Sequence, residues 1–362
     1  MQALILVGGE GTRLRPLTLT MPKPVVPLVD RPLIRYMVDW LARHGVDDVV
    51  MACGFMAEGV HDVLGDGGDG GPRLRYVAEP EARGTAGAIK FAERFLDERF
   101  LALNGDVLTD LDLTALIALH EERGATATIA LHPVADPSAY GLVRRREDGE
   151  ISEFLEKPAA DQIDTDEINA GAYVLEKSVL DLVPEGRECS IEREVFPSLV
   201  GNGLYGCRLD GYWTDIGTPD RYLQATWDIL ERRVETEPGK RLDDRGRLIE
   251  DEVEIADGAE IEAPVVVEGR TTVASGAKLG PRAVVGTATE IGERAVVTES
   301  VLHRGCRIGA GAEIRGAILA AGVEVGDGAT IESGAVIGEG ARISAGVAVE
   351  RDARIQPGEE HS

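Results

Sequence analysis

The sequence predicts an α/β domain with a doubly wound, mostly parallel sheet, followed by a parallel β-helix built from hexapeptide repeats. Two observations indicate this architecture. Strand-like and helix-like segments alternate through roughly the first 225 residues, and an aliphatic residue then recurs at every sixth position. A chain of 362 residues is long enough to bury two cores. We therefore expect domains at 1–234 and 251–362, joined by a polar, charged linker at 235–250.

The first domain is predicted from short apolar runs that alternate with amphipathic segments. The predicted strands are Ala3–Val7, Asp48–Ala52, Phe100–Leu103 and Thr126–Leu131, and the predicted helices are Arg31–His44, Ala86–Phe95, Thr114–Arg123 and Pro219–Val234. In such sheets ligands bind beyond the carboxyl ends of the strands. The polar residues that follow two of these strands, at Gly8 and at Asp106, are therefore expected at a binding site.

The second domain is predicted from a six-residue aliphatic period. The period passes through Ile255, Ile261, Val267, Val273, Leu279, Val285, Ile291 and Val297, slips by one residue to Leu302, Ile308 and Ile314, and slips again to Leu319, Val325, Ile331, Ile337, Ile343, Val349 and Ile355. Each hexad would form one side of a triangular coil. The alternative is a flexible glycine-rich tail, but a disordered tail has no reason to keep aliphatic residues in register.

The charge of the chain excludes some classes of partner. Its formal net charge is -26, from 64 acidic and 38 basic residues, so nucleic acid and anionic membranes are repelled. The apolar run Leu4–Val7 is too short for a signal peptide or a membrane span. The four cysteines form no Cys-x-x-Cys pair, which fits a reducing compartment. We therefore expect a cytoplasmic protein.

A glycine-rich segment after the first predicted strand carries the positive charge that phosphate binding requires. Its glycines at positions 8, 9 and 11 let backbone N–H groups approach a phosphate, while Arg13 and Lys23 supply cations. The segment lacks the Gly-Lys-Ser/Thr of a Walker A loop and the third glycine of a dinucleotide-binding fingerprint. A tight turn with solvated arginines is the alternative interpretation.

Two aspartates are candidate ligands for Mg²⁺. Asp106 follows a predicted strand, and Asp215 lies among the aromatic and apolar residues of Gly211–Gly217. Carboxylate oxygens suit this hard cation, and an acid in apolar surroundings requires a partner. The alternatives are a turn or capping role for Asp106 and a hydrogen-bonded core position for Asp215.

A third group of polar residues follows in Phe154–Pro158 and at Asn169. Glu156 can accept hydrogen bonds from sugar hydroxyls, Lys157 can bind a sugar phosphate, and Asn169 can both donate and accept. A Glu-Lys-Pro sequence alone is usually an exposed turn, so this assignment depends on the other motifs.

Together these motifs resemble the sugar-1-phosphate nucleotidyltransferases over nearly the whole chain. The matching segments are Leu4–Gly9, Gly84–Gly87, Ile168–Gly171, Ser190–Pro197 and Gly211–Gly217. The segment Ser190–Pro197 favours the branch of mannose-1-phosphate guanylyltransferases. The resemblance implies a Rossmann-like nucleotidyltransferase domain followed by a left-handed β-helix of hexapeptide repeats.

The resemblance also implies a role for each matching residue. In the nucleotide site it implies Leu6, Gly8, Gly9, Gly11, Thr12 and Gly105, with Glu79, Gly84, Thr85 and Ala86 at the base. In the sugar-phosphate site it implies Tyr140, Gly141, Glu156, Lys157, Asn169 and Gly171. It implies Arg13, Lys23 and Lys157 as catalytic cations and Asp106 and Asp215 as the Mg²⁺ ligands. The sequence Pro80–Gly84 departs from the Pro-Leu-Gly that the family places beside the base pocket.

The implied reaction joins mannose 1-phosphate to GTP and releases pyrophosphate. Because the sugar phosphate oxygen is already anionic at neutral pH, catalysis consists of positioning and charge neutralisation, without a general base. Three alternatives are the same chemistry with dTTP or UTP and glucose or N-acetylhexosamine 1-phosphate, a non-catalytic regulatory subunit, and an acyltransferase centred on His303. The retained charged residues disfavour the regulatory subunit, and an isolated histidine disfavours the acyltransferase. We expect the repeat domain to mediate homo-oligomerisation or feedback.

Overall fold

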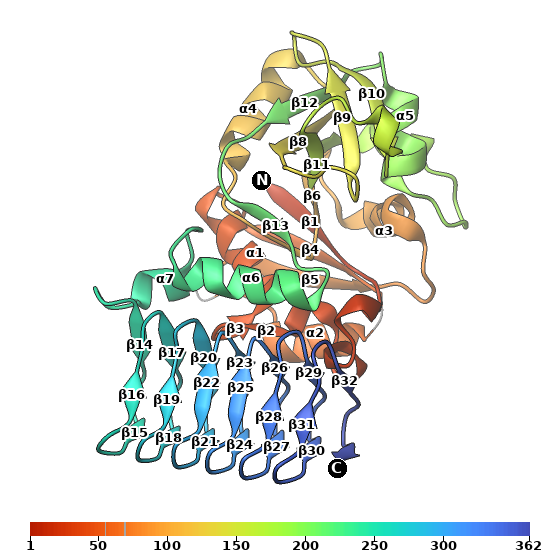
Figure 1. Ribbon diagram of the computed structural model, residues 1–362. Coiled ribbons are helices and arrows are strands. Elements are labelled where there is room, and N and C mark those ends of the chain that lie inside the picture. Colours follow the sequence, from red (N-terminus) through yellow and green to blue (C-terminus); the bar gives the residue numbers. More distant parts are fainter. Residues whose placement is uncertain (55, 69) are drawn as a thin grey trace. The chain divides into compact units, whose positions relative to one another are not determined.

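The computed structural model describes residues 1–54, 56–68 and 70–362 (Figure 1). These residues form two compact units that do not follow the order of the sequence. The first unit contains Met1–Gly9 and Ile34–Trp213, and the second contains Glu10–Leu33 and Thr214–Ser362. The glycine-rich segment is thus divided between the units after its second glycine.

Among the described residues, the first unit holds a nine-stranded sheet. Its strands are β1 (Gln2–Val7), β4 (Asp48–Cys53), β5 (Arg73–Ala78), β6 (Arg99–Asn104), β8 (Ala127–Pro133), β9 (Gly141–Arg145), β10 (Ile151–Glu156), β11 (Glu167–Glu176) and β12 (Leu204–Arg208). The order is β10-β9-β11-β6-β1-β4-β5, with β8 beside β11 and β12 beside β8. Strands β6, β1, β4 and β5 are parallel, whereas β11 runs antiparallel to its neighbours. The predicted parallel sheet is confirmed, and β11 makes the whole sheet a mixed one.

Alternate strand residues point into two hydrophobic cores on opposite faces of this sheet. In β1, Ala3 and Ile5 belong to one core and Leu4 belongs to the other. The helices of the unit are α1 (Leu33–Arg43), α2 (Ala57–Leu64), α3 (Gly84–Ala92), α4 (Leu113–Arg123) and α5 (Phe196–Leu199). Residues of α1 and α4 join the first core, while residues of α3 and α5 join the second. The predicted doubly wound arrangement is therefore confirmed.

Local signals explain where these helices begin and end. Helix α4 begins after Asp112, whose carboxylate accepts hydrogen bonds from the N–H groups of Thr114 (2.9 Å) and Ala115 (3.2 Å). The same helix ends at Gly124, which adopts a left-handed φ of 56°. No helix in the described part of the chain is long and apolar enough to cross a membrane.

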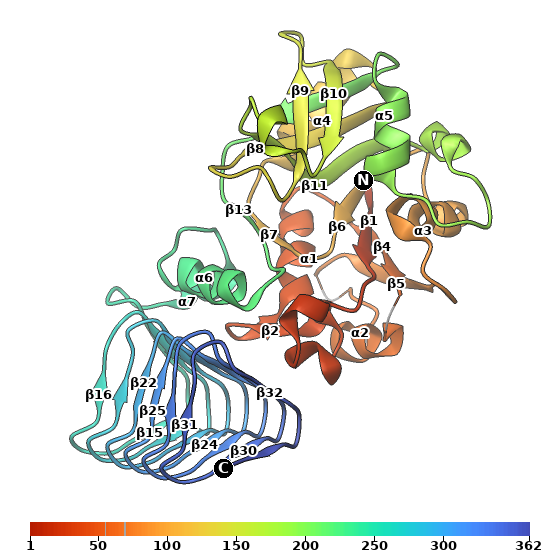
Figure 2. The same cartoon turned by 45° about the vertical axis from the view of Figure 1, so that its right-hand side comes forward.

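The second unit contains the β-helix, whose coils are stacked one behind another in Figure 2. One stack holds β14 (Arg247–Ile249), β17 (Val265–Val267), β20 (Ala283–Val285), β23 (Val301–Leu302), β26 (Ile318–Leu319), β29 (Val336–Ile337) and β32 (Arg354–Ile355). A second holds β15 (Glu254–Ile255), β18 (Thr272–Val273), β21 (Glu290–Ile291), β24 (Arg307–Ile308), β27 (Glu324–Val325), β30 (Arg342–Ile343) and β33 (Glu360–His361). The third holds β16 (Glu260–Ile261), β19 (Lys278–Leu279), β22 (Val296–Thr298), β25 (Glu313–Arg315), β28 (Thr330–Ile331) and β31 (Ala348–Val349).

The strand pairing accounts for the two slips in the six-residue period. Val267 pairs with Val285, a coil of 18 residues, whereas Val285 pairs with Leu302 and Leu302 with Leu319, coils of 17 residues. Each slip therefore removes one residue at a corner and leaves the aliphatic side chains stacked in a single core. The predicted β-helix and its register are confirmed.

The remaining elements of the second unit come from both ends of the sequence. The N-terminal part contributes three 3₁₀ turns (Thr12–Leu14, Leu17–Leu19 and Lys23–Val25) and a small hairpin of β2 (Pro27–Leu28) and β3 (Arg31–Pro32). The C-terminal part contributes two helices, α6 (Pro219–Leu230) and α7 (Glu237–Arg241). A short strand of the first unit, β7 (Val107–Thr109), pairs with β13 (Trp213–Asp215), which contains the last residue of the first unit. The expected linker range of 235–250 thus contains α7 and β14, and the domain boundaries stay a prediction.

Candidate active site

The end of β1 lies directly against the turn after β6. Gly9 adopts a φ of 100°, which favours glycine, and Gly105 donates its N–H to the carbonyl of Leu6 at 2.9 Å. A Cβ on Gly105 would lie only 2.5 Å from that carbonyl, so this close approach requires glycine. The structure therefore brings together Leu6 and Gly105 of the expected nucleotide site, and half-buried Asp106 follows Gly105 in the chain.

The expected base-binding residues lie at the start of α3. Gly84 opens this helix with a φ of 70°, and a Cβ there would lie 2.6 Å from the carbonyl of Cys189. Ala86 donates its N–H to the same carbonyl at 3.0 Å. Glu79 follows β5 and is half-buried, and burial raises the pKa of its carboxyl group.

A carboxylate that the sequence analysis did not assign joins this turn to a second loop. Glu192 accepts hydrogen bonds on one carboxylate oxygen from the hydroxyls of Thr85 (2.7 Å) and Ser190 (2.8 Å). The Thr85 hydroxyl accepts in turn from the N–H of Ile191 at 2.9 Å. Glu192 lies in a π-helical turn (Ile191–Val195), a rare conformation that occurs frequently at functional sites.

The six expected sugar-phosphate residues gather on β9, β10 and β11. Gly141 and Glu156 are directly paired across the β9–β10 ladder, and the N–H of Lys157 donates to the carbonyl of Tyr140 at 3.1 Å. Asn169 donates to the hydroxyl of Tyr173 at 2.9 Å and accepts from the N–H of Gly171 at 2.9 Å. Lys157 has a left-handed φ of 53°, an uncommon backbone conformation that concentrates at ligand sites.

The sugar-phosphate group also carries an electrostatic signature. Burial raises the pKa of Glu156, and the neighbouring charge of Glu192 raises it further, while Lys157 and Arg193 lower it. The charge of Glu192 thus acts on a residue of the expected sugar-phosphate group. Its signal in the sequence was the Ser190–Pro197 motif, which indicated a family branch without indicating which side chain acts.

The second unit holds the two expected cations of the glycine-rich segment. Gly11 has a φ of 59° and begins the turn that contains Thr12 and Arg13. Its carbonyl accepts from the hydroxyl of Thr18 at 2.8 Å, and a Cβ on Gly11 would lie 3.0 Å from the Cβ of Lys23. The structure therefore brings Gly11, Thr12 and Lys23 together around one turn.

Asp215 lies in the same unit and close to Arg13. A Cβ on Gly217 would lie 2.7 Å from a guanidinium nitrogen of Arg13 and 2.8 Å from a carboxylate oxygen of Asp215. The other oxygen of Asp215 forms an ion pair with Arg221, which the sequence analysis did not assign. Of the expected residues, Arg13 and Asp215 thus meet at Gly217, while Asp106, the base residues and the sugar-phosphate residues belong to the first unit.

The acyltransferase alternative depends on an accessible His303. Its side chain is 4% exposed and its Nε2 lies 3.2 Å from the hydroxyl of Tyr222. Burial lowers the pKa of His303 to about 4. A buried, neutral imidazole inside the protein cannot reach an acyl donor, so the structure disfavours this alternative.

Comparison with known proteins supports both parts of the fold. A family model described as "Nucleotidyl transferase" matches residues 2–232, and one described as "EIF2B subunit epsilon LbH domain" matches residues 266–358. A UTP–glucose-1-phosphate uridylyltransferase of Synechocystis is 35% identical, covering 87% of this chain and 86% of the relative. A mannose-1-phosphate guanylyltransferase of Mycobacterium tuberculosis is 37% identical, covering 77% of this chain and 76% of the relative.

A solved structure adds to these matches. The crystal structure of HddC from Yersinia pseudotuberculosis, complexed with GMP-PN, is similar with a TM-score of 0.54 and 27% sequence identity. The similarity covers 63% of this chain and 98% of that one. Because the family match covers more than half of the residues and the relatives cover most of the chain, this protein belongs to the nucleotidyl transferase family.

Proposed function

We propose that this protein transfers a guanylyl group from GTP to mannose 1-phosphate and releases pyrophosphate. The observation that carries the proposal is the 37% identity to a mannose-1-phosphate guanylyltransferase over 77% of the chain. The guanine nucleotide analogue named in the HddC complex supports the choice of base. UTP with glucose 1-phosphate is the second candidate pair, because a uridylyltransferase is 35% identical over 87% of the chain.

Each part of the proposed substrates is assigned to the residues whose chemistry suits it. Backbone N–H groups at Gly8 and Gly9, next to Leu6 and Gly105, would donate hydrogen bonds to the phosphates of the nucleotide. The turn at Gly84 would hold the base beside Glu79. Glu156 and Asn169 would bind sugar hydroxyls. Arg13, Lys23 and Lys157 would neutralise phosphate charge. The tight turns at these glycines and the raised pKa of Glu156 support the assignments.

We propose that the reaction uses Mg²⁺, since carboxylate oxygens suit this ion. The described residues hold no group of three His, Cys, Asp or Glu that could coordinate a metal without help. Mg²⁺ is usually bound by one or two carboxylates together with substrate phosphates, so Asp106 and Asp215 would suffice as protein ligands. When bound, the ion would supply charge neutralisation on the phosphates. The ion pair with Arg221 would hold Asp215 in place before the substrates bind.

The reaction would proceed by direct displacement. An oxygen of the sugar phosphate would form a bond to the α-phosphorus while the bond from that phosphorus to pyrophosphate breaks. Arg13 and Lys23 would stabilise the negative charge on the departing pyrophosphate, and Lys157 would hold the attacking phosphate in line. No proton has to be removed from the attacking oxygen.

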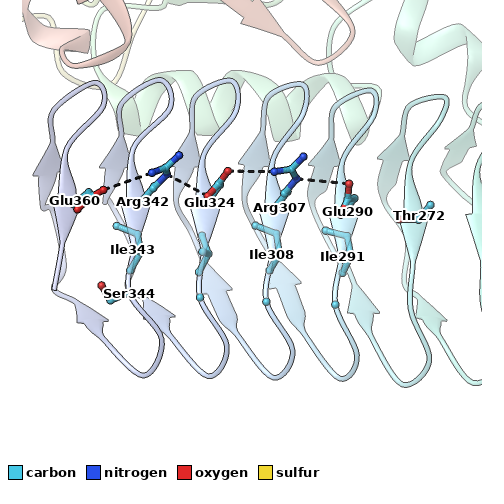
Figure 3. Close-up of a pocket in the computed structure, with 14 residues that line it drawn as sticks. Thr272, Glu290, Ile291, Arg307, Ile308, Glu324, Arg342, Ile343, Ser344 and Glu360 are labelled. Carbon is cyan, nitrogen blue, oxygen red and sulfur yellow. Dashed lines mark hydrogen bonds and ion pairs between the residues drawn. The ribbon is translucent and has the colours of Figure 1, made fainter.

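We also propose that the protein forms homo-oligomers through the β-helix. Figure 3 shows a row of alternating charges on a shallow groove of about 720 Å³ along the stack that contains β21 and β30. The row runs Glu290, Arg307, Glu324, Arg342 and Glu360, with successive ion pairs of 3.3–3.7 Å. A two-fold axis between Arg307 and Glu324 would set opposite charges against each other in a second copy.

The oligomer proposal has a charge-reversal test. The double variant R307E/R342E should dissociate the oligomer in analytical ultracentrifugation, because it places like charges across the interface. R315E, on a different stack, is the matched control and should leave the oligomer intact. A native protein that is monomeric at assay concentration, or an unchanged double variant, would overturn the proposal.

The proposed setting of the reaction is the cytoplasm. The four cysteines are free and three of them are buried, which suits a reducing compartment. The net charge of -26 makes nucleic acid and anionic membranes unsuitable partners. The nucleoside triphosphate and the sugar 1-phosphate remain the partners that the site can accommodate.

The proposed function is tested by measuring pyrophosphate release in a matrix of substrates. ATP, GTP, dTTP and UTP are each combined with mannose, glucose and N-acetylglucosamine 1-phosphates, with and without Mg²⁺. We expect the strongest rate with GTP, mannose 1-phosphate and Mg²⁺. Asp106→Ala should lower kcat by about 10²–10³-fold, the range for loss of an electrostatic stabiliser.

Each other result of the matrix has a definite meaning. A maximum at UTP with glucose 1-phosphate would keep the reaction type and replace the substrates. Full activity without Mg²⁺, or in Asp106→Ala, would overturn the metal assignment. No release of pyrophosphate in any combination would favour the regulatory-subunit alternative.

A further inference from the structure

Helix α6 connects the glycine-rich segment to the β-helix through one tyrosine. Tyr222 is 1% exposed, and its hydroxyl donates to the carbonyl of Pro27 at 2.5 Å. The same hydroxyl lies 3.2 Å from Nε2 of His303, at the end of β23 in the β-helix. These three residues belong to one compact unit, although 195 residues separate Pro27 from Tyr222.

The direction of these hydrogen bonds follows from the groups involved. A carbonyl can only accept, so the single hydroxyl proton of Tyr222 points to Pro27. Nε2 of His303 must therefore carry a proton and donate to the tyrosine oxygen. The other ring nitrogen, Nδ1, is buried without a hydrogen-bond partner among the described residues, as expected for a neutral imidazole protonated on Nε2.

A second contact holds the same hairpin from its other end. Arg241 of α7 donates to Asp30 at 2.5 Å and to Glu250 at 2.7 Å. Asp30 lies in the turn between β2 and β3, whereas Pro27 begins β2. The hairpin is therefore tied at both ends to the C-terminal part of the chain.

The hairpin is in turn continuous with the proposed phosphate-binding residues. The N–H of Val26 donates to the carbonyl of Lys23 at 3.1 Å, and the N–H of Leu33 donates to the carbonyl of Val26 at 3.1 Å. A 3₁₀ turn thus joins Lys23 directly to the residue before Pro27. Movement of the Pro27 carbonyl would be carried to Lys23 through three residues of hydrogen-bonded backbone.

We propose that Tyr222 and His303 are positioning residues through which the β-helix holds the glycine-rich segment, and with it Arg13 and Lys23, in the geometry needed for the release of pyrophosphate. This inference rests on the proposed function of the site. It assigns the β-helix a part in the reaction without any residue of the β-helix touching a substrate. Because the sugar-phosphate residues belong to the other unit, the effect should be confined to the triphosphate and pyrophosphate.

The first test removes the tyrosine hydroxyl. Tyr222→Phe should raise KM for GTP, and for pyrophosphate in the reverse reaction, by about 10-fold, since two buried polar groups lose their partner. KM for mannose 1-phosphate should change by less than about 2-fold. Tyr76→Phe is the matched control, because it removes a tyrosine-to-carbonyl hydrogen bond (2.6 Å, to Gly65) in the first unit.

The second test asks whether a donor is needed at His303. His303→Gln retains an N–H donor, whereas His303→Leu does not. We expect the glutamine variant to keep a KM for GTP within about 3-fold of wild type and the leucine variant to match Tyr222→Phe. Equal kinetic constants in both variants would overturn the role of the histidine.

A measurement independent of turnover separates this inference from the proposed function. Amide hydrogen exchange of residues 10–33 should be faster in Tyr222→Phe than in wild type and in Tyr76→Phe. Faster exchange in a protein that shows no transferase activity would support the positioning role and overturn the proposed function. Unchanged exchange in this segment, or an equal rise in KM for every substrate, would overturn the positioning role.

Discussion

Gly217 shows how one missing side chain can shape a site. The space that a Cβ would need is limited by the guanidinium of Arg13 at 2.7 Å and the carboxylate of Asp215 at 2.8 Å. Gly217 does not have a left-handed φ, so close packing is what favours glycine here. Both charged neighbours are proposed to act on the phosphates, and their relative position would depend on this residue.

Gly217→Ala is therefore expected to lower kcat by about 10–100-fold with little loss of stability, because an added methyl group displaces one charged side chain. Steady-state kinetics and the midpoint of thermal unfolding measure the two quantities. Gly71→Ala is the control, since among the described residues its Cβ would meet only the carbonyl of Gly68 at 3.6 Å. An unchanged kcat in Gly217→Ala would show that Arg13 and Asp215 are not held by this contact.

Two titratable groups, the half-buried Glu268 and the buried His303, make opposite contributions to stability as the pH changes. Burial raises the pKa of Glu268 to about 7, with the charges of Glu250 and Asp30 adding to the rise and Arg241 opposing it. Its contribution to stability is full below the ordinary pKa of 4.5 and is lost as the pH rises through 7. Burial lowers the pKa of His303 to about 4, so its contribution is present above 6.5 and is lost as the pH falls towards 4.

The two effects should largely cancel between pH 4.5 and 6.5, and single variants should separate them. In Glu268→Gln the free energy of unfolding should rise with pH across this window, because the contribution of His303 increases with pH and that of Glu268 no longer offsets it. In His303→Gln it should fall with rising pH. In each variant the free energy of unfolding should change by at most about 3 kcal/mol between the ordinary and the shifted pKa of the remaining group. Urea unfolding at several pH values measures the slopes, and parallel curves for both variants would contradict the assignment.

The π-helical turn Ile191–Val195 and the start of α3 form one hydrogen-bonded element. Glu192 accepts from both Thr85, expected at the base, and Ser190. Its charge also raises the pKa of Glu156, which is expected at the sugar. Glu192 thus interacts with one residue of each proposed substrate site.

Glu192→Ala should raise KM for both GTP and mannose 1-phosphate by about 5–100-fold, because it leaves the hydroxyl of Thr85 at the base without its acceptor and removes the charge that acts on Glu156 at the sugar. The expected pattern differs from that of Tyr222→Phe, which should raise KM for GTP but leave KM for mannose 1-phosphate nearly unchanged. Initial-rate kinetics with each substrate varied in turn distinguish the two patterns. Glu185→Ala, an exposed carboxylate in a nearby loop, is the control and should have wild-type constants.

Regular elements could be predicted from the sequence where a local period exists. The aliphatic period from Val267 onward identified the coils and both one-residue slips, because every coil repeats the same inward-facing position. Helix α4 and its ends were predictable from its apolar spacing and Gly124. The antiparallel direction of β11 had no such signal, since strand direction depends on contacts between distant residues.

Site residues were predictable only where glycine or charge patterns are local. The role of Glu192 depends on Thr85, 107 residues earlier, and no local pattern indicates that pairing. The grouping of Glu10–Leu33 with the C-terminal part of the chain depends likewise on Tyr222 and Arg241. Such contacts are decided by tertiary packing, which a single sequence does not record.

At the scale of the whole protein, the second unit combines residues 10–33 with the β-helix, so a defect in one coil is expected to affect activity as well as stability. Its coils stack only on their neighbours, so a defect in the middle of the stack weakens contacts on two sides and a defect at the end weakens contacts on one. Strand β24, which follows His303 in the same coil, pairs with β21 and β27, whereas β32 pairs with β29 near the C-terminal end.

Ile308→Ala in β24 and Ile355→Ala in β32 remove equivalent buried side chains, 3% and 5% exposed. Each should cost about 2–5 kcal/mol for the lost burial and the cavity, with the central variant at the upper end. Only Ile308→Ala should also lower the temperature at which activity is lost, because it loosens the coil that holds His303 against Tyr222. Thermal melts run in parallel with residual-activity measurements test this. Equal loss of activity in the two variants would mean that the β-helix supports the glycine-rich segment as a rigid whole rather than through this one coil.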